Sequence, residues 1–206
     1  MKKSMKTAQL GWWVGIFFLL LALPAGAGTA TDQTRATVDK VLSTLNNPSL
    51  KGDARRERLR EAIYSRFDFV EMAKRSLGSH WSRRSPEEQQ EFVRAFTELL
   101  GRSYLDKIES FSGEKVAYSR EQQEQDNAEV FTKIITKKGE EFSVNYKLHP
   151  VGGEWKVYDV VVEDISLVNN YRSQFDRILA NASFDELLRK LRQKTPDFKR
   201  PAVKQG

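Results

Sequence analysis

The sequence of 206 residues contains no cysteine and only two histidines, His80 and His149. Without cysteine the chain has no disulfide framework, no N-terminal cysteine for a lipid anchor and no thiol nucleophile. His80 lies beside Trp81, and His149 lies in a turn that also contains proline and glycine. Neither has a second ligand at metal-binding spacing. We therefore predict no disulfide-stapled fold, no metal site and no bound cofactor.

The first 27 residues have the pattern of a secretory signal peptide. Three lysines precede an apolar run over residues 10–23, and Pro24 is followed by Ala25-Gly26-Ala27. A basic start, a short apolar run and small residues at the end are typical of a cleaved export signal, and the run is short for a membrane-spanning helix. We predict cleavage after Ala27 and export to the periplasm, one domain over residues 28–198, and a basic tail over 199–206.

Basic residues outnumber acidic ones by 34 to 28, but the surplus lies at the two ends of the chain. Residues 189–206 carry seven Lys and Arg against Asp197 alone, and the leader carries three more lysines. Because the rest of the chain is not basic overall, we predict no nucleic-acid partner. The basic residues of segment 51–60 and Arg83-Arg84 indicate a solvated surface, with docking to an anionic membrane or an acidic partner as the alternative.

Apolar residues at helical spacing predict helices before and after a central region of different period. The strongest start signal is Ser85-Pro86-Glu87-Glu88, where serine caps the helix, proline occupies its first turn and Glu88 closes a capping box. Gly78 supplies a helix stop. The predicted helices cover residues 34–45, a segment capped by Asp53, residues 67–77, a long segment from Ser85 to about Ile108, and residues 169–181 and 184–193.

The central region has a period of two, which predicts strands over residues 114–120, 128–136, 141–148 and 154–165. The turns at residues 137–139 and 149–153 are short enough for hairpins, so the strands should pair antiparallel. Helices that are segregated from an antiparallel sheet indicate the α+β class. We predict an antiparallel sheet of four to five strands packed against several helices.

The segment Trp155–Phe175 joins the last predicted strand to an amphipathic helix. Strict alternation places apolar side chains on both faces of the strand: Trp155, Val157, Val161 and Ile165 on one, Tyr158, Val160 and Val162 on the other. Such a strand is covered on both faces. Tyr171, Phe175, Ile178 and Leu179 share one stripe of the helix. We interpret the strand as a wall and the helix as a lid around an apolar ligand.

Eight apolar or aromatic side chains are our candidates for the lining of an apolar cavity, and several of them are tyrosines, which suit a pocket mouth that is wet at one end. The alternative is that each is ordinary core. The candidates are Phe96, Leu100, Tyr104, Tyr146, Val161, Tyr171, Phe175 and Leu179.

Asp159 has the same parity as Val157 and Val161, so it interrupts an apolar face of this strand. A carboxylate in an apolar cavity is one way to make a general base, which suggests an enzyme of the isomerase or dehydratase type. The structural alternative ties Asp159 to an arginine, a helix N-terminus or a strand bend. We favour it because the sequence shows no second polar partner, no G-x-S-x-G motif and no phosphate-binding loop. We therefore expect no catalytic residue.

An ordered set of short motifs over residues 34–198 resembles the MlaC family, also called the toluene-tolerance family. One departure is Asp164, where the family usually has glycine. The matching motifs are Phe67-Asp68-Phe69, Met72-Ala73, Leu77-Gly78 with Trp81, Gln89, Phe92 and Phe96 through Leu100 and Tyr104, Trp155 to Val160, Ser166-Leu167, and Asn170 to Phe175.

The resemblance implies a sheet of NTF2-like or cystatin-like shape, with helices closing an apolar cavity for phospholipid tails. It also implies a carrier without enzymatic activity, which passes lipid between an outer-membrane lipoprotein–porin complex and an inner-membrane ABC transporter with a hexameric lipid-binding subunit. We expect a monomer with phospholipid as its ligand. Two alternatives remain: an NTF2-like periplasmic enzyme with Asp159 as its base, and a periplasmic chaperone or adaptor that binds peptide.

Overall fold

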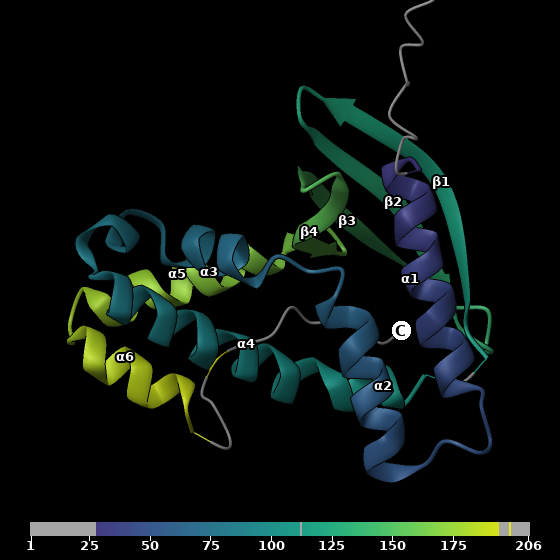
Figure 1. The fold of residues 1–206 in the computed structure, drawn as a ribbon, viewed down its shortest axis with the longest axis horizontal. Coiled ribbons are helices and arrows are strands. Elements are labelled where there is room, and N and C mark those ends of the chain that lie inside the picture. Colours follow the sequence, from purple (N-terminus) through teal and green to yellow (C-terminus); the bar gives the residue numbers. More distant parts are fainter. Residues whose placement is uncertain (1–27, 112, 194–197, 199–206) are drawn as a thin grey trace, which may run out of the picture.

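An antiparallel sheet with two helices against it lies on one side of the molecule, and a group of helices extends to the other side (Figure 1). The computed structural model describes residues 28–111, 113–193 and 198. The predicted α+β class is confirmed, while the predicted leader and the predicted basic tail lie outside the described residues. No helix in the described part of the chain is both long enough and apolar enough to cross a membrane.

The sheet has five strands whose order in space follows their order in the sequence. Gly152 and Gly153, with φ of +59° and +84°, form the tight turn between the third and fourth strands. The predicted last strand is divided in two by a second turn, at Glu163-Asp164. The strands are β1 (Lys115–Glu124), β2 (Asn127–Ile135), β3 (Glu141–Val151), β4 (Glu154–Val162) and β5 (Ile165–Ser166).

The pairing of β3 with β4 contains one irregularity. Lys147 pairs with Asp159, but the next residue of β3, Leu148, pairs with Val157. Tyr158 is therefore an extra residue on β4, which is the arrangement of a β-bulge.

The bulge changes which side chains of β4 share a face. Val157 lies on the same face as Val160 and Val162, whereas Asp159 and Val161 lie on the opposite face. Our prediction that Val157 and Val161 point the same way is wrong. A period of two reverses at a bulge, and nothing in the local apolar pattern marks where the extra residue is inserted.

Local capping signals set the starts of most helices. The predicted capping box of Ser85 and Glu88 is present, and a second one joins Thr29 and Asp32. Asp53 lies in the first turn of its helix and not at the cap, which is Lys51. The helices are α1 (Ala30–Leu45), α2 (Gly52–Tyr64), α3 (Phe69–Leu77), the short 3₁₀ helix η1 (Gly78–Arg83), α4 (Pro86–Glu109), α5 (Leu167–Leu179) and α6 (Phe184–Leu191).

Helix α1 lies across one face of the sheet and is held there by residues distant in sequence (Figure 1). A guanidinium nitrogen of Arg66 donates to the Gln33 side-chain oxygen and to the Trp155 carbonyl, each at 2.6 Å. The same Gln33 oxygen accepts the Trp155 amide at 3.0 Å. Arg66 therefore connects α1, the α2–α3 junction and β4.

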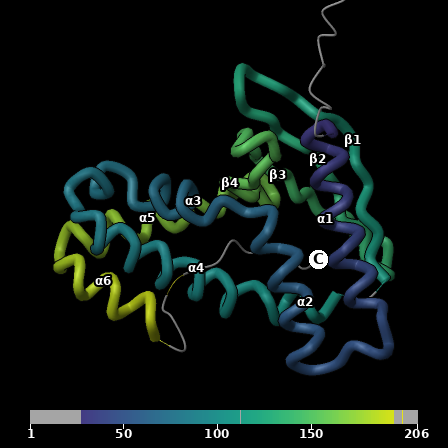
Figure 2. Tube along the Cα trace, viewed as in Figure 1, coloured from purple at the N-terminus to yellow at the C-terminus, as the bar shows by residue number. Residues whose placement is uncertain are grey.

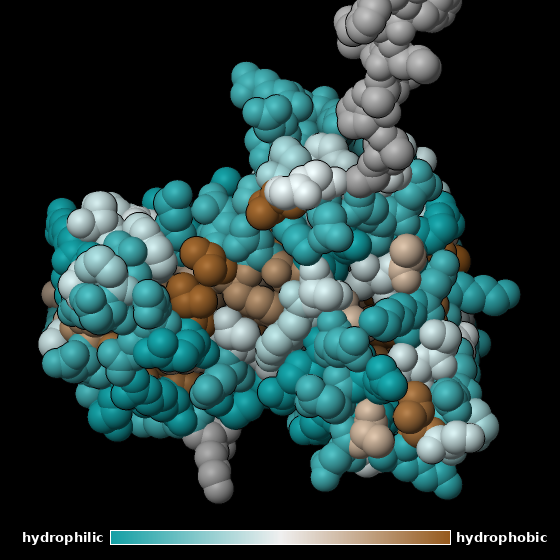
Figure 3. Space-filling model, in the orientation of Figure 1, coloured by the Kyte–Doolittle hydropathy of each residue, from teal (hydrophilic) through white to brown (hydrophobic). Residues whose placement is uncertain are grey.

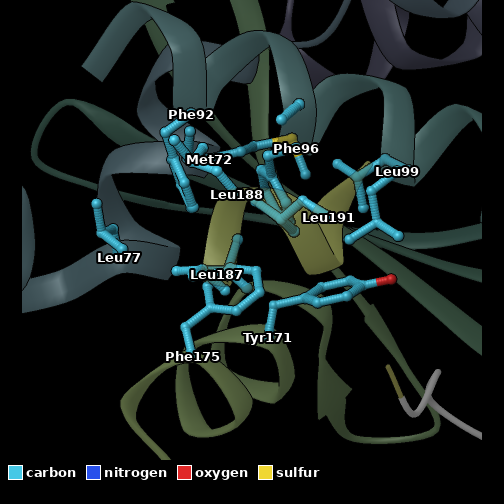
Figure 4. Close-up of a cluster of buried hydrophobic side chains, with 14 of the residues drawn as sticks. Met72, Leu77, Phe92, Phe96, Leu99, Tyr171, Phe175, Leu187, Leu188 and Leu191 are labelled. Atoms are coloured by element: carbon cyan, nitrogen blue, oxygen red, sulfur yellow. The ribbon is translucent and has the colours of Figure 1, made fainter. Parts of the chain in front are cut away.

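Helix α4 runs from the group formed by α3, α5 and α6 to the side that holds α1, α2 and the sheet (Figure 2). Its first half packs into the helical core, where Phe92 and Phe96 meet side chains of α5 and α6 (Figure 4). Phe198 joins this cluster, 5.5 Å from Phe175 between ring centroids. The second half of α4 is left to face α2 and the sheet.

Candidate functional site

A pocket of about 310 Å³, partly open to solvent, lies between one face of the sheet and helices α1, α2 and α4. Nearly all of its lining is aliphatic or aromatic. The lining residues are Thr37, Val38, Val41, Leu42, Leu45, Ile63, Tyr64, Phe67, Phe69, Met72, Leu100, Gly101, Tyr104, Leu105, Lys107, Ile108, Phe111, Val116, Ile134, Phe142, Val144, Tyr146, Val160, Val162 and Leu167.

The sheet contributes a continuous apolar wall because directly opposed residues of neighbouring strands share a face. Tyr146 pairs with Val160 and Val144 pairs with Val162. Farther along, Ile134 pairs with both Phe142 and Val116. All of these side chains line the pocket.

An aromatic group closes the pocket beside the α2–α3 junction. The ring of Phe69 lies 4.7 Å from that of Tyr64 and 5.9 Å from that of Phe67, measured between centroids. A backbone hydrogen bond fixes the chain here, because the Asp68 amide donates to the Val157 carbonyl at 2.8 Å. The Phe67 and Phe69 rings are stacked, the Tyr64 ring meets Phe69 edge-on, and with this backbone anchor they give that end of the pocket a defined wall.

Gly101 allows α2 and α4 to approach closely at the pocket. A Cβ atom at this position would lie 2.8 Å from the Tyr64 hydroxyl oxygen, which is closer than such atoms pack. A glycine inside a helix ordinarily costs stability, so its use here has a packing reason.

Burial disfavours the ionised form of three tyrosines in this region. It raises the pKa of Tyr146 to about 12, and it raises the pKa of Tyr64. It also raises the pKa of the neighbouring Tyr118, where the Arg35 guanidinium, 4.0 Å from the ring centroid, acts in the opposite direction. Ionisation of these three phenols is therefore moved further into the alkaline range.

The structure divides the eight candidate residues into two groups. Leu100, Tyr104 and Tyr146 line the pocket. The other five, Phe96, Val161, Tyr171, Phe175 and Leu179, are not among its lining residues.

Four of those five belong to the core of the helical layer (Figure 4). The Phe96 ring lies 5.3 Å from that of Tyr171 and 5.7 Å from that of Phe175, between centroids, and Leu179 packs against the same cluster. Val161 lies on the other face of β4. The α5 stripe that we interpreted as a lid is therefore part of a packed core. Helical spacing indicates that a stripe is buried, but it does not indicate which element covers it.

The covering that we had assigned to α5 comes mainly from α1 instead. Val38, Val41, Leu42 and Leu45 of α1 line the pocket and are only partly buried. Their helical spacing was visible in the sequence, but it has the same form as an ordinary core stripe.

Asp159 is held at the start of α5 and does not line the pocket. Its carboxylate accepts the Ser166 hydroxyl at 2.6 Å and the Val168 amide at 3.0 Å. Of the three structural roles that we considered for Asp159, the structure shows the contact with a helix N-terminus, and the carboxylate is not placed to act as a base in this pocket. Among the described residues, no group of three His, Asp or Glu is arranged to hold a metal ion.

The basic residues of α2 are largely engaged with neighbours. Arg56 contacts Asp106 at 2.5 Å and Glu109 at 2.6 Å. Arg58 pairs with Glu61 on the same helix. This pairing favours the solvated surface that we predicted over a free anion-binding patch.

On the face shown in Figure 3, apolar residues gather in a recess over α3 and the segment that joins it to α2, and most of the rest is hydrophilic. Val70 of α3 is 56% exposed. Phe67 and Phe69 of the same region line the pocket.

The amino-acid sequence is related to those of known proteins. The family model described as MlaC protein matches residues 35–193. The chain is 26% identical over 204 residues to the "Intermembrane phospholipid transport system binding protein MlaC" of Haemophilus influenzae, covering 92% of this chain and 95% of that one. It is 26% identical over 174 residues to "Toluene tolerance protein ttg2D" of Pseudomonas putida, covering 78% and 79%.

The fold is also that of a solved relative. The phospholipid-binding protein of Ralstonia solanacearum, determined in complex with a phospholipid, aligns with a TM-score of 0.73 and 26% identity, covering 81% of this chain and 97% of that one. Because the family model spans most of the chain and the fold agrees, this protein belongs to the MlaC family of phospholipid-binding transport proteins.

Proposed function

We propose that this protein is a periplasmic carrier that binds glycerophospholipid by its acyl chains in the pocket between the sheet and helices α1, α2 and α4. The observation that carries the proposal is the nearly continuous apolar lining of that pocket. A solved relative of the same fold was determined in complex with a phospholipid. Of the eight candidate residues, Leu100, Tyr104 and Tyr146 are the proposed lipid contacts.

The energetics fit a carrier. Two acyl chains contain roughly 30 methylenes, and each is worth about 0.8 kcal/mol when removed from water. A bare lipid would therefore cost tens of kcal/mol to move through an aqueous gap. In an apolar pocket most of that cost disappears relative to the bilayer. The carrier itself then needs little energy to load or unload, so the direction of transport is set by its partners.

The proposed partners follow from the family. An inner-membrane ABC transporter with a hexameric lipid-binding subunit and an outer-membrane lipoprotein–porin complex would exchange lipid with this protein. The predicted export signal supports a periplasmic location, and the pocket, with Asp159 outside it, supports a role without chemical turnover. Transfer of labelled phospholipid between nanodiscs that carry the two complexes tests this route, and transfer that is unchanged when the protein is omitted would refute it.

Two adjacent isoleucines of β2 give a matched test of the pocket. Ile134 lines the pocket, whereas Ile135 is half-buried on the opposite face of the sheet. Ile134→Glu places a carboxylate among acyl chains and should remove most of the co-purified phospholipid, because an unpaired charge is costly in an apolar site. Ile135→Glu should retain it. Native mass spectrometry and lipid extraction measure the occupancy, and circular dichroism checks the fold.

Equal lipid occupancy in the two folded variants would exclude this pocket as the lipid site. A wild-type protein that carries no phospholipid, and acquires none from vesicles, would overturn the proposed function itself.

A further inference from the structure

The rim of the pocket carries one charge that the binding of hydrocarbon does not explain. Among the described residues that line the pocket, Lys107 alone is charged. It lies in the last turn of α4, and it is exposed to solvent. An apolar pocket with a cation at its edge suits an amphiphile that has an anionic group next to its chains.

The acidic neighbours of Lys107 are engaged elsewhere. Asp106 and Glu109 both contact the Arg56 guanidinium, at 2.5 and 2.6 Å. Over residues 28–111, 113–193 and 198, the Lys107 ammonium has no ion pair with a carboxylate. Arg56 balances one of these two negative charges, and neither carboxylate is paired with Lys107, which leaves its ammonium available for an external anion.

We propose that Lys107 contacts the phosphate of the bound lipid at the rim of the pocket, an inference that rests on the proposed function. The phosphate is the one anion common to glycerophospholipids, and it is attached to the glycerol that carries the chains. A lysine ammonium binds phosphate as a point charge and makes few geometric demands. Lys107 therefore selects for phosphate and discriminates little between the groups beyond it.

A single exposed contact is compatible with release. Solvent and salt screen the attraction of an exposed charge pair, so this contact adds selectivity without trapping the lipid. A lysine near the end of a helix also stabilises the helix dipole. That role alone would affect the melting temperature of the protein and leave its preference among lipids unchanged.

The test measures affinity for two lipids with identical chains, dioleoylphosphatidylglycerol and dioleoylglycerol, using the delipidated full chain. The wild type should bind the phosphate-bearing lipid about three- to tenfold more tightly. Lys107→Met should abolish that ratio while dioleoylglycerol binds unchanged, and Lys107→Arg should preserve it. Lys115→Met, an exposed lysine outside the pocket lining, is the matched control. Dioleoylphosphatidylethanolamine should behave like dioleoylphosphatidylglycerol.

The outcomes are separable. An equal ratio in the wild type and Lys107→Met, with both lipids bound, overturns the role of Lys107 and leaves the carrier function standing. A wild type that binds neither lipid refutes the carrier function. Inorganic phosphate alone should not displace either lipid, and displacement would show a free-phosphate site instead of a headgroup contact.

Discussion

Two residues at the β4–β5 turn adopt the left-handed backbone conformation, which residues other than glycine rarely adopt. Glu163 and Asp164 have φ of +48° and +63°. Our comparison with the family motif identified Asp164 as a departure from glycine, and the turn forms nonetheless. Left-handed backbone costs about 1–2 kcal/mol for a residue with a Cβ, and aspartate tolerates it better than most.

Asp164→Gly should therefore raise the free energy of unfolding by up to about 1 kcal/mol, because glycine adopts positive φ without a steric cost. Urea denaturation measures the change. Glu163→Gly is the control, since Glu163 also accepts hydrogen bonds from the amide and the hydroxyl of Ser143 and should gain little. A loss of stability in Asp164→Gly would contradict the strain argument.

Asp159 offers a second residue-scale prediction. Asp159→Ala should lower the free energy of unfolding by about 1–3 kcal/mol, because the buried Val168 amide and the Ser166 hydroxyl lose their acceptor. In the fraction that remains folded, phospholipid occupancy should stay at the wild-type level. A folded variant with unchanged stability and no lipid would instead assign Asp159 to the binding site.

At the scale of elements, the contact between α2 and α4 depends on Gly101. Gly101→Ala gains helix propensity of about 1 kcal/mol, but its Cβ would lie 2.8 Å from the Tyr64 hydroxyl. In a Tyr64→Phe background the obstacle is gone. The alanine should therefore stabilise Tyr64→Phe and should stabilise the wild type less or not at all. A double-mutant cycle from chemical denaturation measures the coupling, and strictly additive effects would remove the packing reason for Gly101.

Helix α1 should respond to lipid more than the other helices do. Val38, Val41, Leu42 and Leu45 line the pocket and are partly exposed, so acyl chains bury surface that is otherwise solvated. We expect slower amide hydrogen exchange over residues 37–45 in lipid-loaded protein than in delipidated protein. Helix α6, whose apolar face packs in the helical core and does not line the pocket, should exchange equally in both states. Equal exchange over residues 37–45 would mean that lipid does not contact α1.

At the scale of the whole molecule, buried tyrosines predict sensitivity to alkaline pH. The pKa of Tyr146 is raised to about 12, whereas an unfolded tyrosine titrates near 10. The folded state thus favours the neutral phenol. The stability that this preference contributes is fully present below about pH 10 and is lost as the pH rises toward 12, at up to about 1.4 kcal/mol per pH unit.

Tyr146→Phe should reduce this slope, which denaturation between pH 9 and pH 12 measures. Tyr118, whose pKa is also raised by burial, contributes to the same window, so Tyr118→Phe and the double variant should reduce the slope further. An identical pH dependence in all four proteins would show that other groups control alkaline unfolding.

The elements predicted from sequence were those with local causes. The Ser85–Glu88 capping box, the Gly78 stop and the tight turn near Gly152-Gly153 each depend on neighbours within a few residues. Asp159 was correctly assigned to a structural role, although its partners became known only from the fold.

The location of the pocket had no local cause. Arg66, Gln33 and Trp155 hold α1 over the sheet across more than a hundred positions, and the bulge at Tyr158 turns Val161 away from it. The amino-acid order alone determined the helices, the strand period, the antiparallel class and the resemblance to the MlaC family, because these follow from hydrogen bonding and spacing along the chain. Only the tertiary structure decided which apolar stripes pack together and which enclose a pocket. A pocket forms where the side chains of elements distant in sequence do not fill the space between them.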